Sequence, residues 1–63
     1  MGASETFGGW LMSRRRALGL TRDELARRAN CAPITVEKIE RGRRKPSEQL
    51  AHLLLDALEV HAG

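Results

Sequence analysis

Four basic residues crowd into five positions of this 63-residue sequence, at Arg41, Arg43, Arg44 and Lys45. Guanidinium and ammonium groups bind phosphate oxygens, and such contacts supply salt-sensitive affinity for nucleic acids. A single basic residue is often only a solvated side chain. Four together indicate a surface that meets a polyanion.

The charge of the chain is polarised along its length. The sequence has 11 Lys and Arg residues against 8 Asp and Glu, a net charge of +3 at pH 7. Residues 21–45 carry eight bases and four acids, whereas residues 46–63 carry three acids and no Lys or Arg. This balance favours one face that meets nucleic acid, the commonest polyanionic partner.

A second set of groups that can contact bases precedes the basic run. In a helix over residues 33–41, Ile34, Glu37 and Lys38 share the side opposite the apolar residues. Lys38 can donate to guanine, Glu37 can accept from cytosine, and the apolar Pro33 and Ile34 can cover a thymine methyl group. The alternative is that Ile34 extends the core while Glu37 and Lys38 are merely solvated.

The sequence offers no arrangement typical of catalysis or metal binding. It has no Ser/His/Asp set, no paired carboxylates in a cleft and no phosphate-binding glycine loop. His52 and His61 lack a third ligand, and Cys31 has no His nearby. We expect no enzymatic activity, no metal and no cofactor.

The chain carries no membrane signal. No apolar run approaches the roughly 18 residues that a membrane span needs. The single Cys31 suits a reducing compartment. We expect a soluble, cytoplasmic protein with no membrane partner.

Local signals divide the chain into short helices. Phe7, Leu11 and Leu18 repeat at helical spacing and predict a helix over residues 7–18, which Gly19 ends.

The next helix has a strong start signal. Thr21 and Glu24 form a capping box, flanked by the hydrophobic pair Leu20 and Leu25. They predict a second helix from Arg22 to about Ala29.

Two further helices follow. Pro33 suits the first position of a helix that runs to Arg41, and Gly42 closes it. Ser47 can cap a fourth helix of about 12 residues, with Leu55 exposed outside its apolar stripe. The stripe consists of Leu50, Leu53, Leu54, Ala57 and Leu58. Residues 1–5 and 61–63 are expected to be disordered.

Two helices joined by a three-residue break, the second polar on its outer side, form a helix-turn-helix pattern. Residues 19–26 (GLTRDELA) and 39–47 (IERGRRKPS) resemble those of the phage-repressor family, also called Cro-like or XRE-type DNA-binding domains. The resemblance implies an all-α, lambda-repressor-like bundle of four short helices, or five where the last family helix is present. It implies one domain over residues 1–63, ordered over about 6–60, with the helix-turn-helix at about 21–42.

The resemblance also assigns contacts to the two groups described above. It places Pro33, Ile34, Glu37 and Lys38 against base edges in the major groove. It places Arg22, Arg41, Arg43, Arg44 and Lys45 against the phosphate backbone. Pro33 stands where relatives often have a hydrogen-bonding residue such as Gln, so the usual adenine readout is not expected here.

One ion pair is expected inside the domain. Glu40 falls on the inner side of its helix beside Val36, and a buried carboxylate needs a cation. Arg14 and Arg15 both lie near the apolar stripe of the first helix. The helical wheel slightly favours Arg14, whereas the resemblance favours Arg15 as the structural partner of Glu40.

These observations predict sequence-specific binding of double-stranded DNA, by a transcriptional regulator or its isolated DNA-binding module. The alternative is an antitoxin-like protein-interaction module that binds DNA secondarily. One such domain reads about half a site, so we expect weak homodimers or dimerisation through a missing region.

Overall fold

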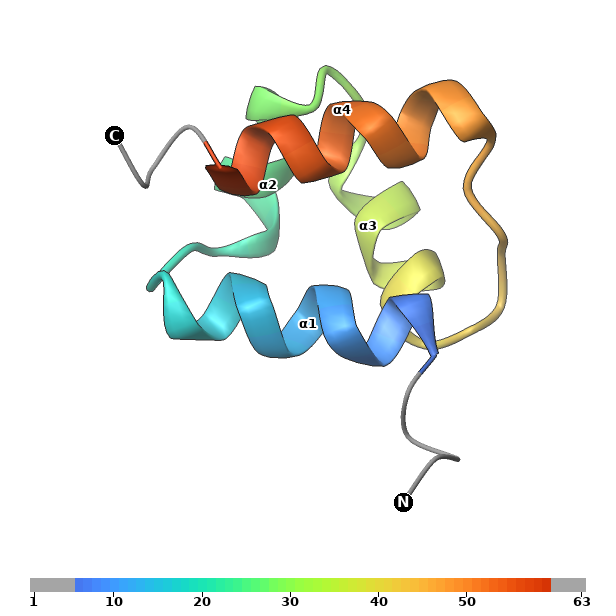
Figure 1. Cartoon of the computed structure of the whole chain (residues 1–63), viewed down its shortest axis with the longest axis horizontal. Coiled ribbons are helices and arrows are strands. Elements are labelled where there is room, and N and C mark those ends of the chain that lie inside the picture. The colour runs from blue at the N-terminus through green and yellow to red at the C-terminus, as the bar shows by residue number, and fades with distance from the viewer. Residues whose placement is uncertain (1–5, 60–63) are drawn as a thin grey trace.

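The computed structural model describes residues 6–59, and this range is helical with no strand. Its four helices are α1 (Phe7–Ala17), α2 (Arg22–Arg28), α3 (Pro33–Glu40) and α4 (Glu48–Glu59) (Figure 1). Each expected helix is present, and the first three end one residue earlier than expected. The all-α bundle is confirmed. The disorder expected for residues 1–5 and 61–63 falls outside the described residues.

Side-chain caps start three of these helices. The Thr6 hydroxyl accepts a 3.0 Å hydrogen bond from the Gly9 amide at the start of α1. Thr21 and Glu24 form the expected capping box, in which each side chain binds the amide of the other residue. Ser47 caps α4 through the Leu50 amide. These helix starts are therefore encoded locally: the caps at Thr21 and Ser47 were predicted from the sequence, whereas the cap at Thr6 was not.

Left-handed residues separate the helices. Gly19 and Gly42, which follow α1 and α3, have φ angles of 72° and 77°. Asn30 has a φ of 60° in the turn between α2 and α3. Asparagine tolerates this conformation better than most residues with a Cβ atom, so the turn forms without glycine.

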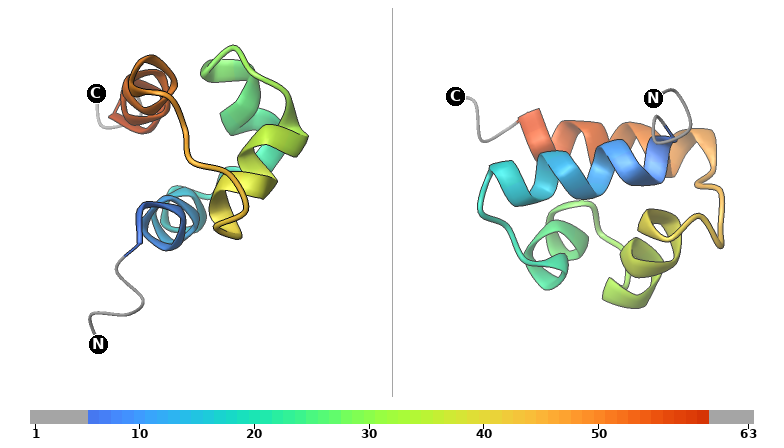
Figure 2. Two further views of the ribbon diagram at one scale, coloured as in Figure 1. Left: turned by 90° about the vertical axis from the view of Figure 1, so that its right-hand side faces the viewer. Right: turned by 90° about the horizontal axis from the view of Figure 1, so that it is seen from below.

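The helices lie in two layers. Figure 2 shows α1 and α4 on one side of the molecule and α2 and α3 on the other. Helix α2 packs against α3 and α4, and α3 packs against α1. Their facing sides bury one core, which consists of Leu11, Leu20, Leu25, Ala26, Ala29, Val36, Ile39, Leu54, Ala57 and Leu58.

The contact between α1 and α3 depends on Gly8. A Cβ atom at Gly8 would overlap the carbonyl oxygen of Ile39 and lie 3.0 Å from that of Glu40. Both of these atoms belong to the backbone, so the overlap cannot be relieved by a change of side-chain rotamer. Gly8 therefore sets how closely the first helix approaches the end of α3.

The expected apolar stripe of α4 is correct at its centre and wrong at its edges. Leu54, Ala57 and Leu58 are buried. Leu53, expected in the stripe, is 36% exposed, whereas Leu55, expected to be exposed, is half-buried. Among the described residues, no helix is long and apolar enough to cross a membrane.

Candidate nucleic-acid interface

The outward side of α3 is open, as the helical pattern predicted. Ile34 is 52% exposed, so it does not extend the core, and Lys38 and Pro33 are exposed as well. Val36 and Ile39, on the opposite side of the same helix, are buried. Helix α3 thus separates residues that hold the fold from residues that can meet a partner.

Several of the expected contact residues converge on one shallow hollow. It has a volume of about 190 Å³ and is lined by Ile34, Glu37, Lys38, Arg41 and Arg43. Three of the expected base-contact residues therefore share a surface with two of the expected phosphate-contact residues. Arg44 and Lys45 line a separate hollow beside Phe7, at the start of α1.

Glu37 is already engaged within this surface. Its carboxylate lies 3.4 Å from Nε of Arg41, one helical turn away. Both side chains are partly exposed, and such a pair contributes only about 0.3–0.5 kcal/mol. A DNA base or phosphate can therefore replace it at little cost. The i,i+4 spacing is a signal from which this pair could have been predicted, although it was not predicted from the sequence.

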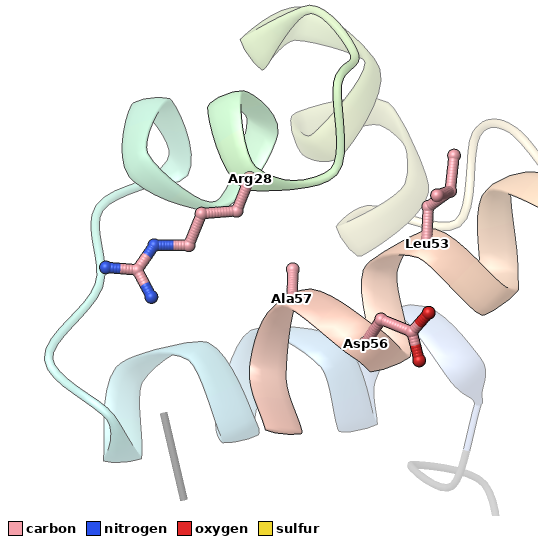
Figure 3. Close-up of a pocket in the computed structure, with 4 residues that line it drawn as sticks. All are labelled: Arg28, Leu53, Asp56 and Ala57. Atoms are coloured by element: carbon pink, nitrogen blue, oxygen red, sulfur yellow. The ribbon is translucent and has the colours of Figure 1, made fainter. Parts of the chain in front are cut away.

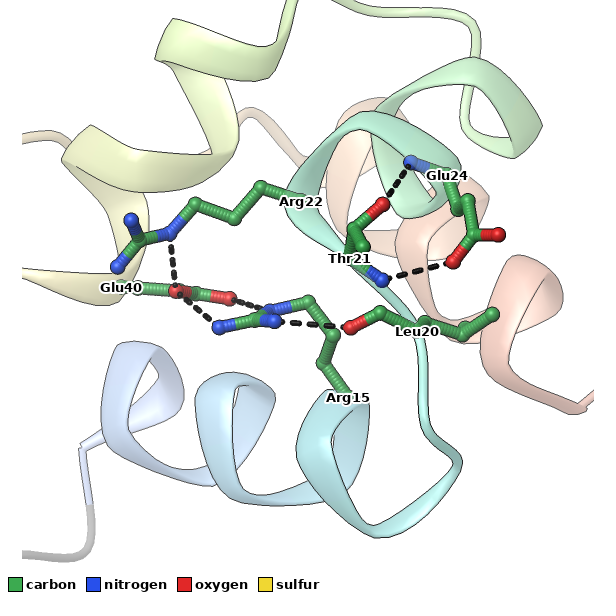
Figure 4. A network of polar contacts seen from close by, with 6 residues as sticks. All are labelled: Arg15, Leu20, Thr21, Arg22, Glu24 and Glu40. Carbon is green, nitrogen blue, oxygen red and sulfur yellow. Dashed lines mark hydrogen bonds and ion pairs between the residues drawn. The ribbon is translucent and has the colours of Figure 1, made fainter.

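Behind the outward side of α3, Glu40 is fully buried and bound by two arginines (Figure 4). Arg15 donates from Nε to Oε2 at 2.6 Å and from Nη2 to Oε1 at 3.2 Å. Its Nη1 group donates to the Leu20 carbonyl at 2.9 Å. The expected Arg15–Glu40 pair is present, whereas Arg14 is exposed.

The second arginine is Arg22, which was expected only to contact phosphate. Its Nε donates to Oε1 of Glu40 at 3.0 Å, across the gap between α2 and α3. The two residues are 18 positions apart on different helices, so no local spacing predicted the bond. Arg22 thus joins the internal ion-pair network to the surface.

The remaining polar candidates form no chemical site. Cys31 is half-buried in the turn before α3, and this burial raises the pKa of its thiol, which disfavours the nucleophilic thiolate. Within the part of the chain that the structure describes, no three His, Cys, Asp or Glu side chains are grouped to hold a metal ion. His61 lies outside that part.

A hollow of about 480 Å³ lies between α2 and α4, away from the outward side of α3. It is lined by Arg28, Leu53, Asp56 and Ala57 (Figure 3). The hollow explains the exposure of Leu53, because α2 does not cover this edge of α4. It brings together one basic, one acidic and two apolar side chains.

The chain belongs to the helix-turn-helix domain family. A family model described as a helix-turn-helix domain matches residues 6–63, nearly the whole sequence. No curated protein and no solved structure matches the chain. Family membership agrees with the helices, the turn and the open side of α3, and it indicates DNA as the partner.

Proposed function

We propose that this chain is the sequence-specific DNA-binding domain of a transcriptional regulator of the phage-repressor type. Helix α3 enters the major groove, where Ile34, Glu37 and Lys38 meet base edges and Pro33 meets a thymine methyl group. The observation that carries the proposal is the shared hollow, in which three of these candidates adjoin two basic residues. It is lined by Ile34, Glu37, Lys38, Arg41 and Arg43.

The basic residues around α3 fix its register on the duplex. Arg41 and Arg43 bind phosphates beside the recognition helix, and Arg44 and Lys45 bind the backbone nearer the start of α1. Phosphate contacts of this kind position a protein without reading sequence. Arg22 adds a contact from α2.

Specific sites are read by two copies. One recognition helix covers about half a site, and two half-sites lie about one helical turn apart. The partly exposed Leu53 and the small core favour weak self-association on DNA rather than a tight dimer in solution. Sedimentation at increasing concentration should show a monomer at nanomolar protein, and a tight dimer there would contradict this arrangement.

Selection of bound duplexes from a random pool tests the proposed function. We expect enrichment of one short sequence, repeated at a fixed spacing, that contains thymine and guanine. Gel shifts then compare the enriched duplex with a scrambled duplex of the same composition, in the presence of competitor DNA. Equal affinity for the two duplexes would contradict sequence-specific binding and favour the alternative of a protein-interaction module.

A further inference from the structure

The ion-pair network around Glu40 holds one more positive charge than the carboxylate needs. Arg15 alone binds both oxygens of Glu40 and is itself 9% exposed. This pair is already neutral and well bonded, as a buried ion pair must be. Arg22 then adds a second guanidinium to the same carboxylate, so the three groups together carry an excess of one positive charge.

The exposed fractions of the three side chains show that Arg22 brings this excess charge to the surface. The side chain of Glu40 is 0% exposed, and that of Arg22 is 35% exposed. The bond between them uses Nε of Arg22, and Figure 4 shows no bond from either terminal nitrogen of Arg22 to Glu40. A guanidinium has five N–H donors, so four remain for another acceptor.

The position of Arg22 suits a backbone phosphate. Arg22 is the first residue of α2, and Glu40 is the last residue of α3. Arg41, which follows Glu40, begins the basic segment and lines the hollow on the outward side of α3. The exposed edge of Arg22 is therefore held beside the end of the recognition helix.

We propose that Glu40 positions Arg22 to bind a DNA phosphate, with Nε kept on Glu40 and the terminal N–H groups on the phosphate. The inference rests on the proposed function and extends it. Glu40 acts through Arg22 and does not contact DNA. The phosphate supplies the negative charge that balances the network, and a held guanidinium loses less side-chain freedom on binding than a free one.

Salt dependence tests the phosphate contact. Affinity for the selected duplex is measured between about 50 and 200 mM salt for the wild type, Arg22→Ala and Arg28→Ala. Arg28→Ala is the matched control, because Arg28 lies on the same helix but lines the hollow toward α4. We expect Arg22→Ala to lower the slope of log affinity against log salt concentration by about 0.9. The ratio of wild-type affinity to Arg22→Ala affinity should then fall about threefold between the lowest and the highest salt concentration. Arg28→Ala should keep the wild-type slope.

The lysine variant tests the positioning. Arg22→Lys keeps the charge but cannot bind Glu40 and a phosphate with one planar group. We expect it to restore the salt slope while its affinity stays several-fold below that of the wild type. Equal slope and equal affinity for Arg22→Lys and wild type would overturn the role of Glu40.

A measurement on the wild-type protein avoids variants that fail to fold. The NMR signal of the Arg22 Nε–H group should exchange slowly in the free protein and remain so in the complex, while its terminal N–H groups become protected only with DNA. Loss of Nε–H protection on binding, or an unchanged slope in Arg22→Ala, would overturn the inference. A wild type that binds no duplex would instead refute the proposed function.

Discussion

Gly8 of α1 and Ile39 of α3 meet backbone to backbone, with no room for a Cβ atom between them. Ile39 also packs into the core with its side chain, so this one residue joins α3 to the core and to α1. The contact lies next to Glu40, whose side chain binds Arg15 of α1. The close approach and the ion pair therefore both hold the C-terminal end of α3 against α1.

Replacing Gly8 with Ala should destabilise the domain. Alanine raises helix propensity by about 1 kcal/mol, but its methyl group forces α1 away from α3. Overpacking of this kind costs about 1–3 kcal/mol, and we expect the loss to dominate because both obstacles are backbone atoms. Thermal unfolding followed by circular dichroism measures the difference. A variant more stable than the wild type would show that the two helices can separate freely.

Arg15 and Arg14 form a matched pair for testing the buried ion pair. Arg15→Leu leaves the buried carboxylate of Glu40 with Arg22 alone. Removing the only partner of a buried charge costs about 3–5 kcal/mol, and because Arg22 remains we expect a loss near the lower end, about 3 kcal/mol. Arg14 is exposed, so Arg14→Leu should change stability by no more than about 0.5 kcal/mol. Urea unfolding of both variants gives the comparison. Similar losses in the two would contradict the assignment of Arg15.

Arg43→Ala and Arg44→Ala should each weaken binding to every DNA sequence. Both side chains are exposed in the basic segment after α3, and phosphate contacts are the same whatever the base. Each change should lower the salt slope by about 1. Binding at several salt concentrations, on the selected and scrambled duplexes, measures this. An unchanged salt slope would show that the replaced residue does not contact a DNA phosphate.

Lys38→Ala should weaken binding to the preferred site by about 1–3 kcal/mol and relax the choice of base at one position. Lys38 is exposed on the outward side of α3, within reach of a guanine edge if this helix enters the major groove. The variant and the wild type are compared on the preferred site and its three single-base variants. Equal losses on all four would identify Lys38 as a phosphate contact instead.

The capping box makes stability depend on pH. The Thr21 amide donates to the Glu24 carboxylate at 2.8 Å, and this bond lowers the pKa of Glu24 below its ordinary value of 4.5. A carboxyl group whose pKa is lower in the folded state contributes stability above its unfolded pKa, and this contribution is lost as the pH falls through the folded value. The change therefore begins near pH 4.5.

Glu24→Gln keeps a capping hydrogen bond but does not titrate. We expect the stability advantage of the wild type over this variant to be largest at neutral pH and to shrink as the pH falls below 4.5. Urea unfolding of both proteins across this range measures the difference. A difference that does not vary with pH would show that ionised Glu24 does not support the cap.

The ends of the helices could be predicted because their signals are local. Thr21 and Glu24 are three positions apart, and Gly19 lies two positions after the last residue of α1, so a short window of sequence holds each signal. Periodicity also identified the two sides of α3. It located the centre of the apolar stripe of α4 but not its width. Whether Leu53 is buried depends on whether α2 covers that edge of α4.

Contacts between helices were less predictable. The helical wheel slightly favoured Arg14, which is exposed, and only the resemblance favoured Arg15, the residue that binds Glu40. The bond from Arg22 to Glu40 and the close approach at Gly8 depend on the distance and angle between helices, which periodicity does not encode. Of the candidate site, the sequence therefore predicted which residues face outward, but not how Arg22 and Glu37 are held.

The two-sided construction of α3 separates recognition from folding. Val36 and Ile39 carry the packing, whereas Ile34 and Lys38 bury little surface. The ion pair between the outward Glu37 and Arg41 is weak. On the proposed function, duplicated genes for such a domain could therefore diverge toward new DNA sites by exchanging outward residues one at a time, because these exchanges leave the buried residues of α3 unchanged.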